Sequence, residues 1–219
     1  MTRRVLVTGF EPFGGEPVNP SLELAQQLAA EAGAVPGLEL HTAALPVDIA
    51  TLRDALDAAL AAARPEAVVL VGQATGRARV CLETLAFNEV RYGSSVDNGG
   101  HRVDDEVVDA EGPAELASTL PLAQLAEDLA PAALPVELSR DAGRYLCNFA
   151  LYDVLRRHPA VPAAFVHVPL LPEQAERRGR GEASLPLDVS RRCLRALLEA
   201  LPARLGPSPG EGSAPPGVA

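Results

Sequence analysis

Three cysteines, Cys81, Cys147 and Cys193, are the side chains in this sequence with the most reactive chemistry. An odd number without a Cys-x-x-Cys spacing argues against a disulfide framework and against a zinc site, so we expect no metal. An important cysteine would therefore act as a thiol. Thiol catalysis uses a thiolate and a base that takes up its proton, so a histidine must lie within reach.

Cys147 lies near the start of a helix predicted over residues 142–157, whose entry offers Ser139 or Asp141 as an N-cap. The positive end of the helix dipole and the free N–H groups there favour ionisation of a thiol and can bind an oxyanion. A lone cysteine in an apolar helix is also a common core residue, and the spacing alone leaves that alternative open.

Four histidines compete for the role of base. His158 lies eleven residues after Cys147 on the same predicted helix, about 16 Å away at ~1.5 Å per residue, so it cannot be the base. His41 and His101 lie in polar or alternating surroundings typical of surface residues. His167 interrupts an apolar run that predicts a buried strand, and it is either the base or a core histidine hydrogen-bonded to backbone.

A carboxylate that orients the imidazole would complete such a group, and Glu83 is the best candidate. It lies in the mostly apolar stretch 80–87, just after a loop over 72–77, where an unpaired charge would be costly. The alternative is a solvent-facing residue on an edge strand, which the spacing does not exclude.

The elements that must carry these side chains alternate between strand and helix. Apolar and β-branched runs predict strands over 4–8, 38–45, 67–71, 135–138 and 163–168. Repeated Leu and Ala predict helices over 21–32, 48–63, 122–129, 142–157 and 187–205, and residues 80–110 predict extended structure and loops. We therefore expect one α/β domain over 1–205, followed by a disordered Pro/Gly/Ser-rich tail over 206–219.

Composition excludes several other classes of function. The 219 residues are 47% hydrophobic and 22% charged, and their net charge of -10 without any lysine argues against nucleic acid as a partner. The apolar run before Gly9 is far shorter than a signal peptide core or the ~20 residues of a membrane span. We expect a cytoplasmic protein that does not bind a membrane.

Four segments together resemble the pyroglutamyl peptidase I family of cysteine peptidases, also called pyrrolidone carboxyl peptidases. They are residues 5–15 with 19–21, residues 72–77 with Glu83 and Asn88, residues 141–148, and residues 165–174. The likeness extends over most of 4–205. It implies that Cys147 is the nucleophile, that His167 transfers the proton, and that Glu83 orients His167.

The resemblance also implies a substrate site and an architecture. Phe10, Phe13 and Tyr145 would form an apolar slot around a flat lactam, with Asn19 in the same site and the backbone of Gln73 bonding the ring. The implied fold is a three-layer α/β/α sandwich with a mixed, mostly parallel central sheet, in a homo-oligomer that is a tetramer or dimer. The implied reaction removes an N-terminal pyroglutamyl (5-oxoproline) residue from peptides through a thioester, without metal or organic cofactor.

The segment from 89 to 97 departs from the family pattern. Family members usually carry Ala-Arg-Ile-Pro-Asp-Asn one residue closer to the glutamate, whereas this chain has Glu-Val-Arg-Tyr-Gly-Ser-Ser-Val-Asp. A role for Arg91 near the substrate is therefore left unassigned. Two other functions stay open: a binding protein that keeps the lactam slot without turnover, and a hydrolase that acts on another lactam or amide.

Overall fold

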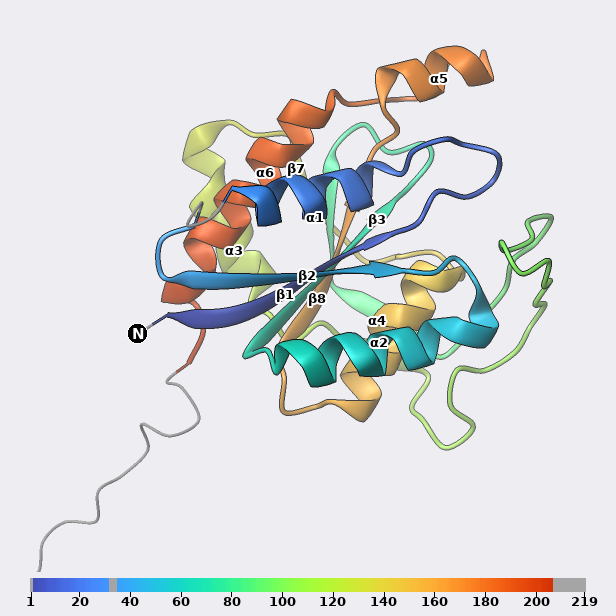
Figure 1. The fold of residues 1–219 in the computed structure, drawn as a ribbon, viewed down its shortest axis with the longest axis horizontal. Coiled ribbons are helices and arrows are strands. Elements are labelled where there is room, and N and C mark those ends of the chain that lie inside the picture. Colours follow the sequence, from blue (N-terminus) through green and yellow to red (C-terminus); the bar gives the residue numbers. More distant parts are fainter. Residues whose placement is uncertain (1, 32–34, 207–219) are drawn as a thin grey trace, which may run out of the picture.

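A six-stranded sheet lies between two layers of helices in the computed structural model of the chain, which describes residues 2–31 and 35–206 (Figure 1). The strand order is β2-β1-β3-β8-β4-β7. The first four strands in this order run parallel, and β4 pairs antiparallel with β8 and parallel with β7. The strands are β1 (Arg3–Phe10), β2 (Leu38–Leu45), β3 (Ala67–Gln73), β4 (Val80–Glu83), β7 (Val136–Ser139) and β8 (Ala163–Val168).

Helices cover both faces of the sheet, which confirms the predicted three-layer α/β/α architecture. One face carries α1 (Pro20–Ala30), α3 (Leu122–Leu129) and α6 (Leu187–Ala200), and the opposite face carries α2 (Ile49–Ala63) and α4 (Leu146–Arg157). A small antiparallel pair, β5 (Leu85–Phe87) and β6 (Glu115–Ala117), contacts α4.

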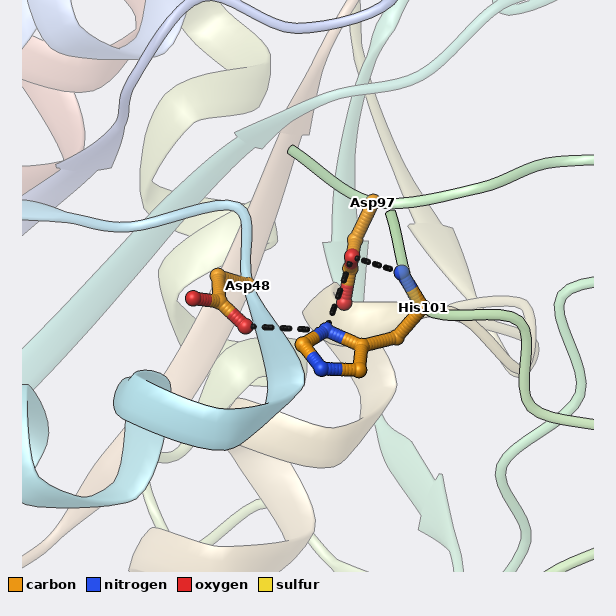
Figure 2. A group of neighbouring side chains, drawn as sticks. All are labelled: Asp48, Asp97 and His101. Atoms are coloured by element: carbon orange, nitrogen blue, oxygen red, sulfur yellow. Dashed lines mark hydrogen bonds and ion pairs between the residues drawn. The ribbon is translucent and has the colours of Figure 1, made fainter. Parts of the chain in front are cut away.

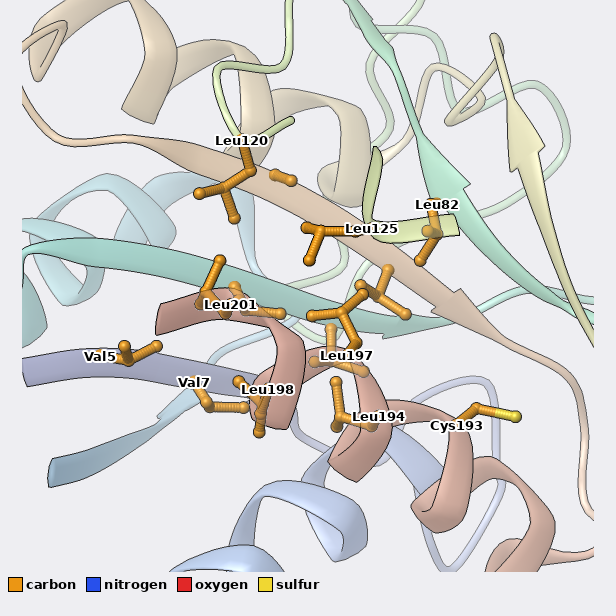
Figure 3. Packing of buried hydrophobic residues seen from close by; sticks show 14 of the residues in the cluster. Val5, Val7, Leu82, Leu120, Leu125, Cys193, Leu194, Leu197, Leu198 and Leu201 are labelled. Carbon is orange, nitrogen blue, oxygen red and sulfur yellow. The ribbon is translucent and has the colours of Figure 1, made fainter. Parts of the chain in front are cut away.

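Alternating residues of the strands divide the core in two, because successive side chains of a strand point to opposite faces. Val166 and Leu82 pack with α1, α3 and α6, in the cluster that Figure 3 shows around Leu194, Leu197 and Leu198. Phe165 packs on the other face with α2 and α4. Glu83 and His167 have the parity of this second face, so both face the layer that contains α4.

A close approach joins the end of β1 to the start of α1. Asn19 caps the helix, with its Oδ1 accepting from the backbone N–H of Ser21 at 3.1 Å, and the N–H of Phe10 donates to Ser21 Oγ at 3.0 Å. A Cβ atom at Gly9 would lie 2.4 Å from the Ser21 carbonyl oxygen. Only glycine therefore permits the contact that brings Phe10 and Asn19 together.

Helix α4 begins later than the sequence predicts, and neither Ser139 nor Asp141 caps it. Its N-cap is Tyr145, which makes no side-chain capping bond. Asp141 Oδ1 instead accepts from the N–H of Gly143 at 2.9 Å, and Gly143 has a φ of +77°. This turn diverts the chain before the helix can start. Cys147 is consequently the second residue of the helix.

Other predicted elements lie where the sequence places them, with small differences at their ends. Helix α6 stops at Ala200 and passes into the 3₁₀ turn η2 (Leu201–Ala203), and a second turn, η1 (Ala130–Ala132), follows α3. The sequence did not predict α5 (Pro172–Arg178) or β6. The predicted end of the first helix at residue 32 and the predicted tail from 207 onward lie outside the described residues. Within those residues, every helix is too short or too polar to cross a membrane.

Candidate active site

His167 and Glu83 meet across two neighbouring strands. In the antiparallel pair of β8 and β4, Glu83 is opposite Phe165, so His167 is its diagonal neighbour on the same face. His167 Nδ1 lies 2.8 Å from Glu83 Oε1, and the two residues are 4% and 0% exposed. Because the carboxylate engages Nδ1, the ring orientation is set and Nε2 is left for proton exchange.

The thiol of Cys147 reaches this face from helix α4. On β3, Gly72 is the partner of His167 in the parallel ladder. A Cβ atom at Gly72 would lie 2.9 Å from Cys147 Sγ and 2.6 Å from the ring of Phe165, so glycine leaves the room that the sulfur occupies. The Phe165 ring in turn lies 4.7 Å from the His167 ring, centroid to centroid. Within the described residues, no hydrogen bond joins this sulfur to the imidazole.

Opposing effects act on the pKa of the Cys147 thiol. Burial, and after it the charge of Glu83, raise the pKa of Cys147 to about 12, while the N–H of Cys147 itself lowers it. The helix start therefore favours ionisation as predicted, but burial is the larger effect. Burial therefore opposes ionisation of the thiol.

A small pocket opens beside the thiol at the carboxyl ends of β1, β2 and β3, with about 280 Å³ of empty space in and around it, open solvent included. Its lining residues are Phe10, Phe13, Asn19, Val47, Gln73, Tyr145, Leu146 and Cys147. The structure thus brings together all five residues that the sequence assigned to substrate binding. Sequence analysis missed Val47 and Leu146, which are ordinary apolar residues with no distinguishing signal in the chain.

Polar side chains around the pocket are already ordered by the protein. Gln73 Oε1 accepts from Gln174 Nε2 at 3.0 Å, and Gln174 Oε1 accepts from the N–H of Leu171 at 2.9 Å. Gln174 is fully buried and stands at the third position of α5. Sequence analysis did not assign it a role, although a glutamine just after a proline at a helix start is a recognisable capping signal.

Asn148, the residue after the thiol, fastens the first turn of α4 to β5. It is fully buried, its Oδ1 accepts from the N–H of Phe87 at 2.8 Å, and its Nδ2 donates to the carbonyl oxygens of Phe87 and Glu89 at 2.8 and 2.9 Å. Arg144 adds a second tie, with its guanidinium 3.6 Å from the Phe87 ring centroid. These bonds fix the position of Cys147.

The segment that departs from the family pattern forms the outer support of the pocket. Arg91 does not line it: the guanidinium pairs with Glu89 and, at 2.8 Å, with Asp105, and its side chain is half exposed. Tyr92 packs edge-on against Tyr145 with ring centroids 4.4 Å apart. Tyr145 also donates its hydroxyl proton to the Val96 carbonyl oxygen at 3.2 Å.

A cluster of Asp48, Asp97 and His101 closes this segment against the start of α2 (Figure 2). His101 Nδ1 lies 3.2 Å from Asp97 and 3.3 Å from Asp48, and the Asp97 carboxylate accepts from the N–H groups of His101 and Ile49. These carboxylate and imidazole atoms lie within 4.8 Å of one another, as metal ligands do. Because N–H groups of the chain already occupy the carboxylate oxygens, we interpret the cluster as a fastening, and call it the latch.

The remaining histidines lie away from the thiol. His158 ends α4 and its Nε2 lies 3.4 Å from Asp57, and His41 pairs with Glu39 on the exposed edge strand β2. His101 is exposed and belongs to the latch. These positions agree with the choice of His167 from the sequence.

A pocket at the carboxyl ends of parallel strands, with a few ordered polar groups in an apolar lining, is typical of an α/β enzyme that acts on a small chemical group. A family model described as pyroglutamyl peptidase matches residues 3–203. The chain therefore belongs to the pyroglutamyl peptidase family, as the four segments of the sequence indicated, and this membership supports pyroglutamyl peptidase activity.

Relatives and solved structures agree with the family model. A pyrrolidone-carboxylate peptidase of Chromobacterium violaceum is 42% identical over 199 residues, covering 90% of this chain and 91% of its own. One from Vibrio vulnificus is 40% identical over 185 residues, covering 84% and 86%. Pyroglutamyl peptidase I of Bacillus amyloliquefaciens superposes with a TM-score of 0.84 at 31% identity, covering 92% and 97%. A mutant pyrrolidone carboxyl peptidase of Pyrococcus furiosus gives 0.84 at 30%, covering 92% and 99%.

Proposed function

We propose that the protein hydrolyses the bond after an N-terminal pyroglutamyl residue, with Cys147 as nucleophile, His167 as proton-transfer group and Glu83 as the residue that orients it. One observation carries the proposal: the His167–Glu83 pair and the Cys147 thiol face the same side of the sheet, beside the pocket that the predicted substrate residues line. Family membership is the second support.

The first half of the reaction forms a thioester. His167 takes the proton of the Cys147 thiol, and the sulfur attacks the carbonyl carbon of the pyroglutamyl residue. The resulting oxyanion lies near the backbone N–H of Cys147, which is the second residue of α4 and has the free donor that helix starts offer. When the intermediate collapses, the C–N bond breaks and His167 donates its proton to the departing amine.

The second half releases the acid. Water attacks the thioester carbon, His167 accepts a proton from this water, and the C–S bond breaks as 5-oxoproline leaves. The sulfur takes up the proton from His167, which restores the starting state. Because burial opposes ionisation of the thiol, the transfer to His167 belongs to the substrate complex, where catalytic hydrogen bonds tighten relative to the unliganded protein.

The pocket suits a neutral, flat ring. The rings of Phe13 and Tyr145 are tilted toward each other with centroids 6.2 Å apart, and the buried Phe10 lines the same pocket. A lactam without charge is recognised by shape and by a few fixed hydrogen bonds. A free N-terminal glutamate or glutamine brings an ammonium group into this apolar lining and loses its hydration, so such peptides should not be cleaved.

Release of a chromophore from pyroglutamyl-anilide tests the proposal. The wild-type protein should turn over, and both the Cys147→Ser variant and the alkylated protein should not. Binding of 5-oxoproline without turnover would support a binding protein instead, and turnover of another amide alone would support a hydrolase of different specificity. The homo-oligomer, the cytoplasmic location and the single domain over 1–205 stay predictions, the first of which light scattering of the same sample would check.

A further inference from the structure

Glu83 places a carboxylate inside the active site with few partners. Its side chain is fully buried, and its Oε2 has no hydrogen-bond partner within the described residues. His167 contacts Oε1, but a neutral imidazole brings a hydrogen bond and no positive charge. Burying an anion is costly unless a cation lies nearby.

Arg77 supplies a permanent positive charge at this point. Its Nη2 lies 3.7 Å from Glu83 Oε1. The same nitrogen donates to the carbonyl oxygen of Asp141 at 2.8 Å and lies 3.4 Å from Ser139 Oγ. The side chain is 32% exposed, so its charge keeps contact with water while acting on a carboxylate that has none.

These contacts join three separate parts of the chain. Arg77 follows β3, Glu83 ends β4, and Ser139 and Asp141 begin the segment that leads from β7 into α4. A planar guanidinium with several donors can bridge such groups, whereas an ammonium acts as a point charge. The nucleophile Cys147 lies six residues beyond Asp141, so the position of this segment bears directly on the sulfur.

We propose that Arg77 is a positioning residue of this active site, compensating the buried charge of Glu83 and holding the segment that leads to Cys147. The inference rests on the proposed function, because Arg77 can have this positioning role only if Glu83 orients His167. The contacts of Arg77 are with Glu83 and with the segment at Ser139 and Asp141, so its action on the reaction passes through these groups.

The direction of the expected effect follows from the groups that face Glu83. They are His167 on β8, Cys147 on α4, Cys81 on β4 and Arg77 itself. Arg77 is the one permanent positive charge among these four groups, and removing it makes it more favourable for the site to hold a proton. The acidic limb of kcat/KM should therefore move to higher pH.

The test compares kcat/KM for pyroglutamyl-anilide across pH in Arg77→Gln, Arg77→Lys and Arg79→Gln. In Arg77→Gln we expect the acidic limb to move up by about one pH unit, since a charge at this distance shifts a neighbouring titration by that order. Arg77→Lys keeps the charge and should return the limb close to its wild-type position. Arg79→Gln is the matched control, because Arg79 pairs at 3.5 Å with Glu137 where both side chains are about half exposed.

The results separate this inference from the proposed function. Wild-type turnover that Cys147→Ser abolishes, together with an Arg77→Gln profile that superimposes on the wild type, would overturn the role of Arg77 alone. Absence of wild-type turnover would overturn both. Urea unfolding of each variant shows whether it folds. If Arg77→Gln does not fold, Arg77→Lys is the deciding variant. An acidic limb of kcat/KM displaced by about one pH unit in Arg77→Lys, despite the retained charge, would contradict the inference.

Discussion

The proposed catalytic side chains and the outer wall of the pocket are held in different ways. Glu83 and His167 lie on adjacent strands of the central sheet, and Cys147 lies on the helix packed over them. The wall at Tyr145 depends instead on the 92–101 segment, where polar side chains bind backbone groups and the latch closes the loop. Strand register therefore positions the proposed catalytic groups, whereas a loop held by polar hydrogen bonds positions the wall of the proposed substrate pocket.

This difference has a physical basis. A strand whose residues are buried on both faces cannot slip by one residue without turning every side chain to the wrong face. A loop held by a few polar bonds opens at a lower free energy and tolerates other sequences. We therefore expect changes in the sheet and α4 to lower kcat, and changes in the 92–101 segment to raise KM.

Cys147→Ser should have the largest effect. A hydroxyl is a far weaker nucleophile than a thiolate, so kcat should fall by about 10³-fold or more while the fold is kept. Cys193→Ala is the control, because Cys193 is buried in the opposite core (Figure 3) and should leave kcat nearly unchanged. A large loss of kcat in Cys193→Ala would contradict the assignment of the nucleophile.

Glu83→Gln should cause the second-largest loss of kcat. The amide keeps the shape but no longer stabilises an imidazolium or fixes its tautomer, so we expect kcat to fall by about 10²-fold to 10⁴-fold with little change in KM. Glu137→Gln, a change of the same kind at a half-exposed side chain, should have almost no effect. Equal losses in both variants would mean that Glu83 acts only through stability.

Asp97→Ala tests the loop side of the comparison. The N–H groups of Ile49 and His101 lose their acceptor, at a cost of about 1 kcal/mol for each hydrogen bond lost at these part-buried positions. The support of Tyr145 weakens, so KM for pyroglutamyl-anilide should rise about tenfold while kcat changes less. Asp104→Ala, at an exposed position just after this segment, should leave both constants unchanged. A fall in kcat without a rise in KM in Asp97→Ala would contradict the proposed difference between the 92–101 segment and the sheet.

Tyr145→Phe should have a smaller effect of the same kind. It keeps the ring that lines the pocket and removes only the hydrogen bond to the Val96 carbonyl oxygen. That bond is worth about 1 kcal/mol, so KM should rise about threefold or less. An effect as large as that of Asp97→Ala would show that the hydroxyl binds substrate directly.

The smallest expected effect concerns the stability of the folded protein at alkaline pH. Burial raises the pKa of Cys81 and Cys147 to about 12 and of Cys193 to about 11, above the ordinary value of a thiol. The folded state therefore binds these protons more tightly than the unfolded state, so its stability is full below about pH 8.5 and declines as pH rises toward 11. Urea midpoints should fall over this range, and less steeply in Cys193→Ala than in the wild type. Parallel curves would contradict the expectation.

The sequence predicted the central strands and helices well, but it predicted poorly the start of α4 and the contacts between side chains of different elements. Strand β8 is a buried apolar run whose one polar residue is His167, and this local contrast identified the candidate base. The predicted start of α4 was wrong, because Asp141 and Gly143 together form a turn before the helix. The same residue types occur at helix N-caps and in turns, so the sequence alone does not distinguish the two. Arg77 and Asn148 were not assigned roles, because their partners come from other elements.

What the chain by itself determined is the order of its strands and helices, the family to which it belongs, and the side chains that face one another in the pocket. Only the tertiary structure decided the diagonal placement of Glu83 and His167, the space above Gly72 that the sulfur fills, and the burial that raises the pKa of the thiol. The reason is that periodicity and turn chemistry act between near neighbours, whereas register, burial and charge compensation depend on residues that only folding brings together.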